Sequence, residues 1–130
     1  MRYVVCLIIG LVIGAIAAST AGNAFARRHA WPRAVMNVMQ HELGTARSAA
    51  RGSQCATPAM ADASAHLKLL GGDLERALLA PDAKDRVFSR YASDMRDTVA
   101  KWDVTADCPR QAEALTAISN ACDACHRDYR

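Results

Sequence analysis

Three side chains close to the C-terminal end of the chain have the types and spacing of a cofactor site. They belong to the run Cys122-Asp123-Ala124-Cys125-His126. On a helix, residues i, i+3 and i+4 share a face, so two thiols and one imidazole would point the same way. This C-x-x-C-H pattern is the attachment signature of c-type haem. Cys122 and Cys125 would bond the two vinyl groups, and His126 would bind the iron through Nε2.

The N-terminal segment has the pattern of a secretory signal peptide. Arg2 precedes an apolar run from Val4 to Ala18, and Ala24-Phe25-Ala26 is a small-residue cleavage pattern. We therefore predict a signal peptide over residues 1–26 and a mature domain over residues 27–130. The alternative is an uncleaved membrane anchor, because no charged residue follows Arg2 within this segment and its length can span a bilayer. Both interpretations place the domain in the periplasm, where disulfides persist.

Three other uses of the motif compete with haem attachment. Cys122 and Cys125 could form a redox C-x-x-C pair, although no βαβ pattern surrounds them. They could bind zinc together with His126, although the sequence offers no second Cys/His cluster of suitable spacing. They could also form an ordinary disulfide. Export, a shared helix face and the motif itself agree best with haem.

Composition favours helices and excludes some functions. Aromatic residues make up only 5% of the 130 residues, and β-branched residues are sparse, which disfavours a β-sandwich or barrel. The formal net charge of +3 is too small for the dense basic surface that nucleic-acid binding requires. The length suits one domain.

Four amphipathic segments must position the motif. Helices are predicted to begin near residues 32, 58, 83 and 108, each with apolar residues spaced by three and four. The apolar positions are Val35, Met36, Met39, Leu43, Ala46 and Ala50; then Ala63, Leu67, Leu70, Leu74 and Leu78; then Phe88, Tyr91, Met95, Val99 and Trp102; and finally Ala112, Leu115, Ile118, Cys122, Cys125 and Tyr129. Short loops between four helices predict an all-α fold, an antiparallel up-down-up-down four-helix bundle. The haem would lie at the C-terminal end of the fourth helix.

The segment from Ile118 to Arg130 resembles the end of cytochromes c′ and c556. These are four-helix-bundle proteins with one haem and the pattern C-x-x-C-H-x-x-[YF]-R on the last helix, which Tyr129 and Arg130 complete here. The segment from Ala34 to Gly44 resembles the first helix of the family, whereas the middle of the chain matches mainly in helical pattern. The resemblance implies one covalently bound haem c and a role in electron transport.

The resemblance also implies roles for single residues. The position that matches Met36 faces the distal side of the haem. Methionine binds iron there in c556-type members, and a non-ligating residue is common in c′-type members. Arg130 matches an arginine of the family motif and is expected in the haem pocket. Pro32 stands where the family has an arginine close to a haem propionate, and Arg33 follows it.

The predicted topology supplies further pocket residues. In an up-down-up-down bundle, the start of the first helix and the end of the fourth lie at the same end, which brings Met36 close to His126. Met39, one turn further along, is the alternative ligand. The other candidates for lining this pocket are Leu74, Leu78, Phe88 and Tyr91.

The same topology places two further cysteines together. Cys55 lies in the loop between the first two helices and Cys108 lies between the last two, so both belong to the opposite end of the bundle. We predict a Cys55–Cys108 disulfide, which an exported protein can retain. Two unpaired thiols are the alternative.

One-electron transfer through a haem bound by His126 and Met36 is the leading functional prediction, because thioether ligation favours ferrous iron. The alternative is a five-coordinate c′-type protein that binds NO or CO, with Val35, Met36 and Met39 forming an apolar distal pocket. An enzyme with an open coordination site ranks last, because no paired acid–base groups accompany that side. The expected partners are periplasmic or membrane redox proteins, and the family's homodimers make a second copy of the chain another candidate.

Overall fold

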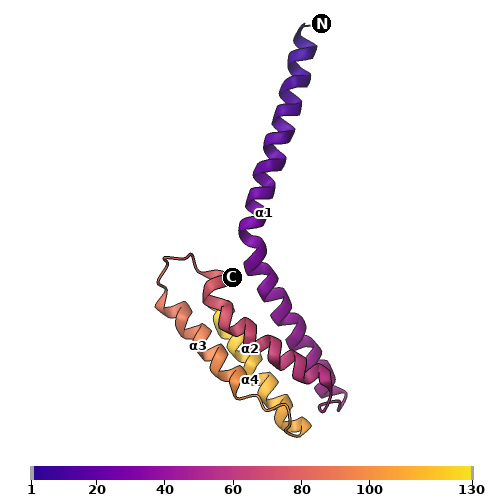
Figure 1. Cartoon of the computed structure of the whole chain (residues 1–130), viewed down its shortest axis with the longest axis vertical. Helices are drawn as coiled ribbons and strands as arrows, with labels where there is room; N and C mark the ends of the chain where they lie inside the picture. Colours follow the sequence, from indigo (N-terminus) through magenta and orange to yellow (C-terminus); the bar gives the residue numbers. More distant parts are fainter. Residues whose placement is uncertain (1, 130) are drawn as a thin grey trace. The chain divides into compact units, whose positions relative to one another are not determined.

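The chain is all-helical in the residues that the structure describes. The structure is a computed structural model, and it describes residues 2–129 except for the side chains of residues 2, 5 and 24–29. Four helices follow one another, α1 (Arg2–Arg51), α2 (Pro58–Leu78), α3 (Arg86–Ala100) and α4 (Cys108–Asp128), and no strand occurs among these residues (Figure 1). The predicted all-α class is therefore confirmed. The chain divides into two compact units, Met1–Arg33 and Ala34–Arg130.

The N-terminal unit contains an apolar helical segment. Its segment Cys6–Asn23 is long and apolar enough to cross a membrane, and none of that segment is buried. Large side chains such as Leu7 and Ile13 are exposed. A helix that is apolar on every side is typical of a segment that meets lipid. This property agrees with both a signal peptide and a membrane anchor.

The first helix does not begin at Pro32 as the sequence predicts. Instead, α1 includes Pro32 in its interior. Proline has no N–H, so one hydrogen bond to the preceding turn is missing there. Ala30, Arg33 and Ala34 beside the proline have high helix propensity, and α1 continues through Pro32.

The second unit has one hydrophobic core to which all four helices contribute. In Figure 1, α2, α3 and α4 run side by side, and α3 packs against both α2 and α4. The buried apolar side chains are Val35, Met39, Leu43 and Ala46 of α1; Met60, Ala63, Leu67, Leu74 and Ala77 of α2; Phe88, Ala92, Met95 and Val99 of α3; Trp102 after α3; and Leu115 and Ile118 of α4. Most of the predicted apolar positions thus form this core, as expected of a helical bundle.

Two aspartates fix where the last two helices begin. The Asp85 carboxylate accepts hydrogen bonds from the N–H groups of Val87 (3.0 Å) and Phe88 (2.9 Å), and α3 begins at Arg86 instead of residue 83. Asp107 accepts from the N–H of Arg110 at 3.0 Å at the start of α4. Such caps satisfy N–H groups that have no partner within the helix.

The start of α2 agrees with the sequence in position but not in capping. Pro58 is the first helical residue and Thr57 occupies the N-cap position, as predicted. The Thr57 side chain does not cap the helix. It donates instead to the carbonyl of Gln54 at 3.2 Å.

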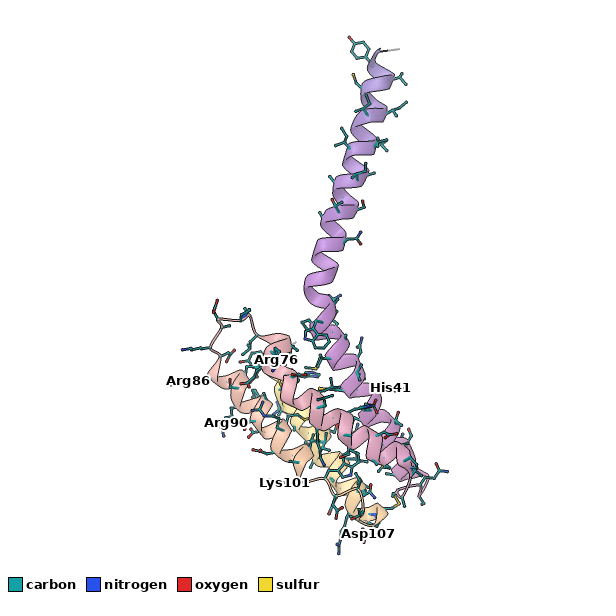
Figure 2. The ribbon with its side chains drawn as sticks, in the orientation of Figure 1. His41, Arg76, Arg86, Arg90, Lys101 and Asp107 are labelled. Atoms are coloured by element: carbon teal, nitrogen blue, oxygen red, sulfur yellow. A yellow bond between two sulfur atoms is a disulfide. The ribbon has the colours of Figure 1, made fainter. Side chains whose placement is uncertain are left out.

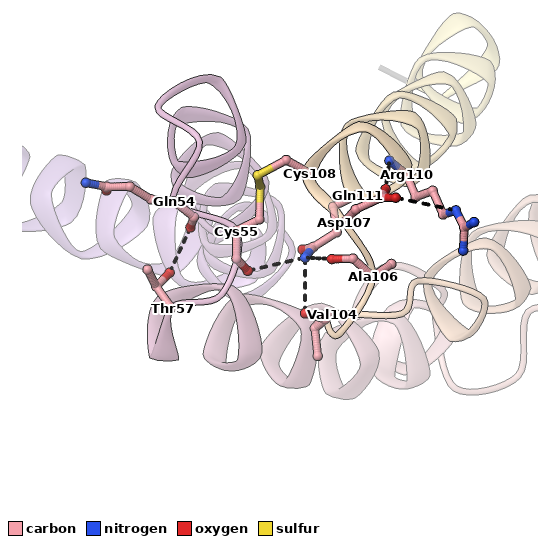
Figure 3. The surroundings of a disulfide bond; sticks show 9 residues. All are labelled: Gln54, Cys55, Thr57, Val104, Ala106, Asp107, Cys108, Arg110 and Gln111. Atoms are coloured by element: carbon pink, nitrogen blue, oxygen red, sulfur yellow. Dashed lines mark hydrogen bonds and ion pairs between the residues drawn. A yellow bond between two sulfur atoms is a disulfide. The ribbon is translucent and has the colours of Figure 1, made fainter.

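A disulfide and a buried amide hold the end of the second unit that is shown in Figure 3. Cys55 is bonded to Cys108 with the Cα atoms 5.4 Å apart, which is the pair predicted from the sequence. The Gln111 side-chain N–H₂ group lies within 3.2 Å of the Cys55 carbonyl, 3.1 Å of the Val104 carbonyl and 2.8 Å of the Ala106 carbonyl. The loop before α2 and the loop before α4 therefore meet at one side chain.

This network corrects one assignment on α4. The sequence pattern places Ala112 on the inner face, but Ala112 is exposed and Gln111 is buried. Burial of the N–H₂ group is possible because loop carbonyls accept its hydrogen bonds. Hydrophobic periodicity alone assigns glutamine to the surface, so it misses this residue.

Candidate functional site

A pocket in the second unit contains the residues of the motif. Its wall includes Cys122, Cys125 and His126 of α4, and side chains from α1, α2 and α3 complete it. All three motif residues lie within α4 and are half-buried. Helical spacing of three and four residues places them on one face. The motif thus faces the interior of the bundle from one helix.

Most of the other predicted pocket residues lie in the same wall. Met36 and Met39 of α1 line the pocket, as do Leu74 of α2 and Phe88 and Tyr91 of α3. Met36 is half-buried, whereas Met39 is buried. Met36 is thus less deeply buried than Met39, although both line the pocket.

Three predicted residues have a different outcome. Leu78 is not among the side chains that line the pocket, and it packs partly buried against the core instead. Val35 is 2% exposed and belongs to the core, not to the pocket wall. Val35 lies one turn before Met39 and Leu78 lies one turn after Leu74, and it is Met39 and Leu74 that line the pocket. Arg130 lies outside the described residues.

Several pocket residues were not identified from the sequence. Gln40 and Arg47 of α1, Met95 of α3 and Ser119 of α4 are the main examples. On α1 a usable signal exists, because positions 36, 40, 43 and 47 follow one another by three or four residues and so share a face. A search for hydrophobic spacing misses this face because Gln40 and Arg47 are polar.

The sulfur atoms of the motif are thiols in a partly desolvated place. Cys122 and Cys125 are free, and the Cys122 sulfur lies 4.0 Å from the Met95 sulfur. Burial raises the pKa of the Cys122 thiol, and the Asp123 carboxylate adds to the shift. Burial also raises the pKa of Cys125, together with Asp128. Catalytic redox C-x-x-C pairs have a lowered pKa on the attacking thiol, so this environment differs from theirs.

The donor set fits haem attachment better than a small metal site. Among the residues that the structure describes, no three His, Cys, Asp or Glu side chains converge as ligands of one ion. Haem does not require such convergence, because each thiol bonds a different vinyl group and only the imidazole reaches iron. The apolar wall also suits a porphyrin face.

The pocket is smaller than a typical ligand site, which affects how a haem would fit. The cavity measures about 230 Å³, below the range of about 300–1,000 Å³ that is typical of ligand pockets. A haem therefore requires the wall side chains to move. Met36, Met39 and Met95 line the pocket, and the unbranched methionine side chain adapts more readily than branched residues.

Two tyrosine–carboxylate hydrogen bonds lie beside the motif. The Tyr91 hydroxyl donates to Asp128 at 2.7 Å, and the Tyr129 hydroxyl donates to Asp85 at 2.7 Å. The bond to Asp85 raises the pKa of Tyr129 to about 12. The bond to Asp128 raises the pKa of Tyr91. Both phenols are therefore protonated donors at neutral pH.

Comparison of this chain with known protein families, with curated proteins and with solved structures finds no match.

Proposed function

We propose that this chain is an exported c-type cytochrome with one covalent haem and that it transfers one electron at a time. The observation that carries the proposal is the placement of Cys122, Cys125 and His126 of α4 in the wall of one largely apolar pocket. A haem supplies iron that alternates between the ferrous and ferric states when it is bound. The chain would hold the group covalently, bind its iron and keep water away from it.

Each motif side chain has one role in this proposal. Cys122 and Cys125 would form the two thioether bonds to the haem, and the His126 imidazole would bind its iron. Met36 would supply a thioether sulfur on the distal side, because it lines the same pocket from α1. Two protein ligands limit rearrangement between the oxidation states, which suits electron transfer.

The bundle would be antiparallel in this proposal, with α1 and α4 contributing opposite walls at one end. Contacts between the helices support that arrangement. Tyr129, just after α4, bonds Asp85, just before α3, and Cys108 at the start of α4 bonds Cys55 before α2. The end of α4 and its start thus meet different loops, as an up-down-up-down connection requires.

A second function differs only on the distal side. Met39, Leu43 and Leu74 are apolar residues of the wall that also contains Met36. If Met36 packs over the iron without bonding it, this wall would leave a site for a small apolar gas such as NO or CO. The visible spectrum separates the two functions, since a six-coordinate ferrous haem is low-spin and a five-coordinate haem is high-spin.

Haem extraction tests the proposal directly. The exported protein should retain its colour in the protein fraction after acid–acetone treatment, because thioether bonds resist it. Cys122→Ser and Cys125→Ser should each weaken or abolish attachment. Asp123→Asn is the matched control, because it changes the residue after the first cysteine and keeps both thiols and the imidazole. Complete extraction of haem from the wild-type protein would contradict the proposal.

Export itself is tested by sequencing the N-terminus of the protein that cells produce. The apolar segment Cys6–Asn23 supports either form of export. A mature protein that begins at residue 27 identifies a cleaved signal peptide. A retained N-terminus in the membrane fraction identifies an anchor. Recovery of an unprocessed protein in the cytoplasm would contradict both.

A further inference from the structure

The last turn of α4 is joined to α3 by a reciprocal pair of hydrogen bonds. Tyr91 of α3 donates to Asp128 of α4, and Tyr129 after α4 donates to Asp85 before α3, each at 2.7 Å. Each side of this contact thus supplies one tyrosine and one aspartate. Asp85 precedes the first residue of α3 and Tyr91 lies within that helix, whereas Asp128 and Tyr129 are adjacent. The two bonds therefore tie the end of α4 to two separate points along α3 and oppose its separation.

Aromatic packing reinforces the same contact. The Tyr129 ring meets the Phe88 ring edge-to-face with centroids 5.3 Å apart, and it meets the Tyr91 ring at 6.2 Å in the same geometry. Phe88 is 4% exposed. Edge-to-face pairs at these distances are favourable beyond the area that they bury. The last turn of α4 is therefore packed against a buried ring as well as hydrogen-bonded.

The Asp85 carboxylate, which accepts from Tyr129, is itself held in place by the backbone of α3. It also accepts from the N–H groups of Val87 and Phe88 at the start of α3. A carboxylate held by backbone groups has little freedom to follow a moving partner. Tyr129 is thus bonded to a group whose position the helix itself determines.

We infer that Tyr91, Asp128, Tyr129 and Asp85 are positioning residues that hold the last turn of α4 and so direct the His126 imidazole into the pocket. In the sequence, His126 follows both cysteines of the motif and precedes Asp128 and Tyr129, which form these bonds. Phe88 and Tyr91 belong to the pocket wall and to this contact at once. The inference rests on the proposed haem function for its consequence at iron, but the contact itself is a property of the chain.

Amide hydrogen exchange tests the contact in the full-length exported protein. Tyr91→Phe and Tyr129→Phe each remove one hydroxyl and keep the ring. The loss of one hydrogen bond is expected to raise exchange in residues 122–129 about fivefold per variant, and more in the double variant. Thr116→Val is the matched control, because it removes a side-chain hydrogen bond from the same helix, to the Ala112 carbonyl. It should leave residues 122–129 unchanged.

The midpoint reduction potential tests the effect on the imidazole. The double variant is expected to shift the potential and the visible spectrum, whereas Thr116→Val should change neither. Asp85→Asn keeps an acceptor oxygen for Tyr129 and should retain more of the wild-type potential than Asp85→Ala. A bond that only adds stability would change the unfolding midpoint and leave the potential as it was.

The outcomes separate this inference from the proposed function. Unchanged exchange in the double variant overturns the inference, and so does faster exchange with an unchanged potential. A chain without covalent haem overturns the proposed function and the effect on iron. In that case, faster exchange confined to residues 122–129 still supports the hold on the last turn of α4.

Discussion

Three methionines from two helices line the candidate haem pocket. Met36 and Met39 come from α1 and Met95 comes from α3. Met39 and Met95 are at most 6% exposed and belong to the core, while Met36 is half-buried. A side chain that is only partly buried against the core can approach a bound group with less disturbance than a fully buried one, which supports the proposal that Met36 is the distal ligand.

Replacing Met36 by alanine should open the iron to carbon monoxide. If the sulfur occupies the distal position in more than nine-tenths of molecules, its removal raises the apparent affinity of ferrous protein for CO by at least about tenfold. Titration with CO, followed by the visible spectrum, measures this change. Met39→Ala should mainly lower stability. A wild-type protein that already binds CO as tightly as Met36→Ala would instead support the gas-binding function.

Gln111 should matter for stability far more than its polar type suggests. Gln111→Ala removes the donor from three carbonyls around the disulfide, and a buried polar group without a partner costs about 1–3 kcal/mol. We expect a loss of about 2 kcal/mol in the free energy of unfolding, measured by urea denaturation. The control is Gln54→Ala, an exposed residue in the same region, which should change stability by less than about 0.5 kcal/mol.

At the residue scale, the motif was identified from residue type and helical spacing. Met36 and Phe88 were placed beside it by the predicted bundle topology, and both line the same pocket as the motif. Gln111 was missed because its partners lie 5, 7 and 56 residues away. The Tyr129–Asp85 bond spans 44 residues and was missed for the same reason. Periodicity reports the face of one helix, and it carries no information on which loop lies opposite.

At the scale of elements, Asp85 makes the start of α3 sensitive to acid. The N–H of Phe88, followed by the Tyr129 hydroxyl, holds the pKa of this carboxyl below its ordinary value of 3.8. Because the pKa of Asp85 is lower in the folded protein than in the unfolded chain, ionised Asp85 stabilises the fold. This contribution is fully present above pH 3.8 and is lost as the pH falls through the pKa of the folded protein. Wild-type protein should therefore lose stability below pH 3.8 relative to Asp85→Asn, which can still cap the helix.

Thermal unfolding between neutral pH and about pH 2 measures the difference in stability between wild type and Asp85→Asn. This pH range is chosen because the pKa of Asp85 is lowered, so its carboxylate is protonated only below pH 3.8. Tyr129→Phe provides a second comparison, because it removes one of the groups that lower the pKa of Asp85. It should bring the acid dependence closer to that of Asp85→Asn. Parallel curves for wild type and Asp85→Asn would show that Asp85 contributes nothing to the acid transition.

Element boundaries were predicted less well than the elements themselves. The four amphipathic stretches were found because each has a repeated spacing of three or four residues. The predicted start of α1 was wrong because proline was treated as a first helical residue, whereas the helix continues through Pro32. The start of α3 was placed too early because Asp85, not residue 83, supplies the cap.

On the scale of the whole molecule, the disulfide should supply a large share of stability. Cys55 and Cys108 are separated by 53 residues, and closing a loop of this length stabilises a fold by about 4 kcal/mol in the chain-entropy model. The double variant Cys55→Ser/Cys108→Ser should lose stability of that order in urea. A reducing agent should bring the wild-type protein to the same value and leave the double variant unchanged. Equal stability with and without the bond would contradict the chain-entropy account.

The two ends of the second unit are held by different chemistry. One has a covalent bond and a buried amide network around Gln111, and the other has the tyrosine–aspartate contacts beside the motif. Topological reasoning predicted the covalent pair because cysteines have few ways to pair. It could not predict the second contact, because tyrosine and aspartate occur at many surface positions without meeting.

The covalent loop also determines how the protein would respond to mechanical force. When the chain is pulled from its two ends, only the residues before Cys55 and after Cys108 can extend. The disulfide transmits the force directly between these two cysteines, so α2 and α3, which lie between them in the sequence, bear none of it. Those two helices would be shielded from tension even after α1 and α4 have been peeled away. Reduction of the bond would release a further extension of about 180 Å, set by 53 residues of chain at full stretch.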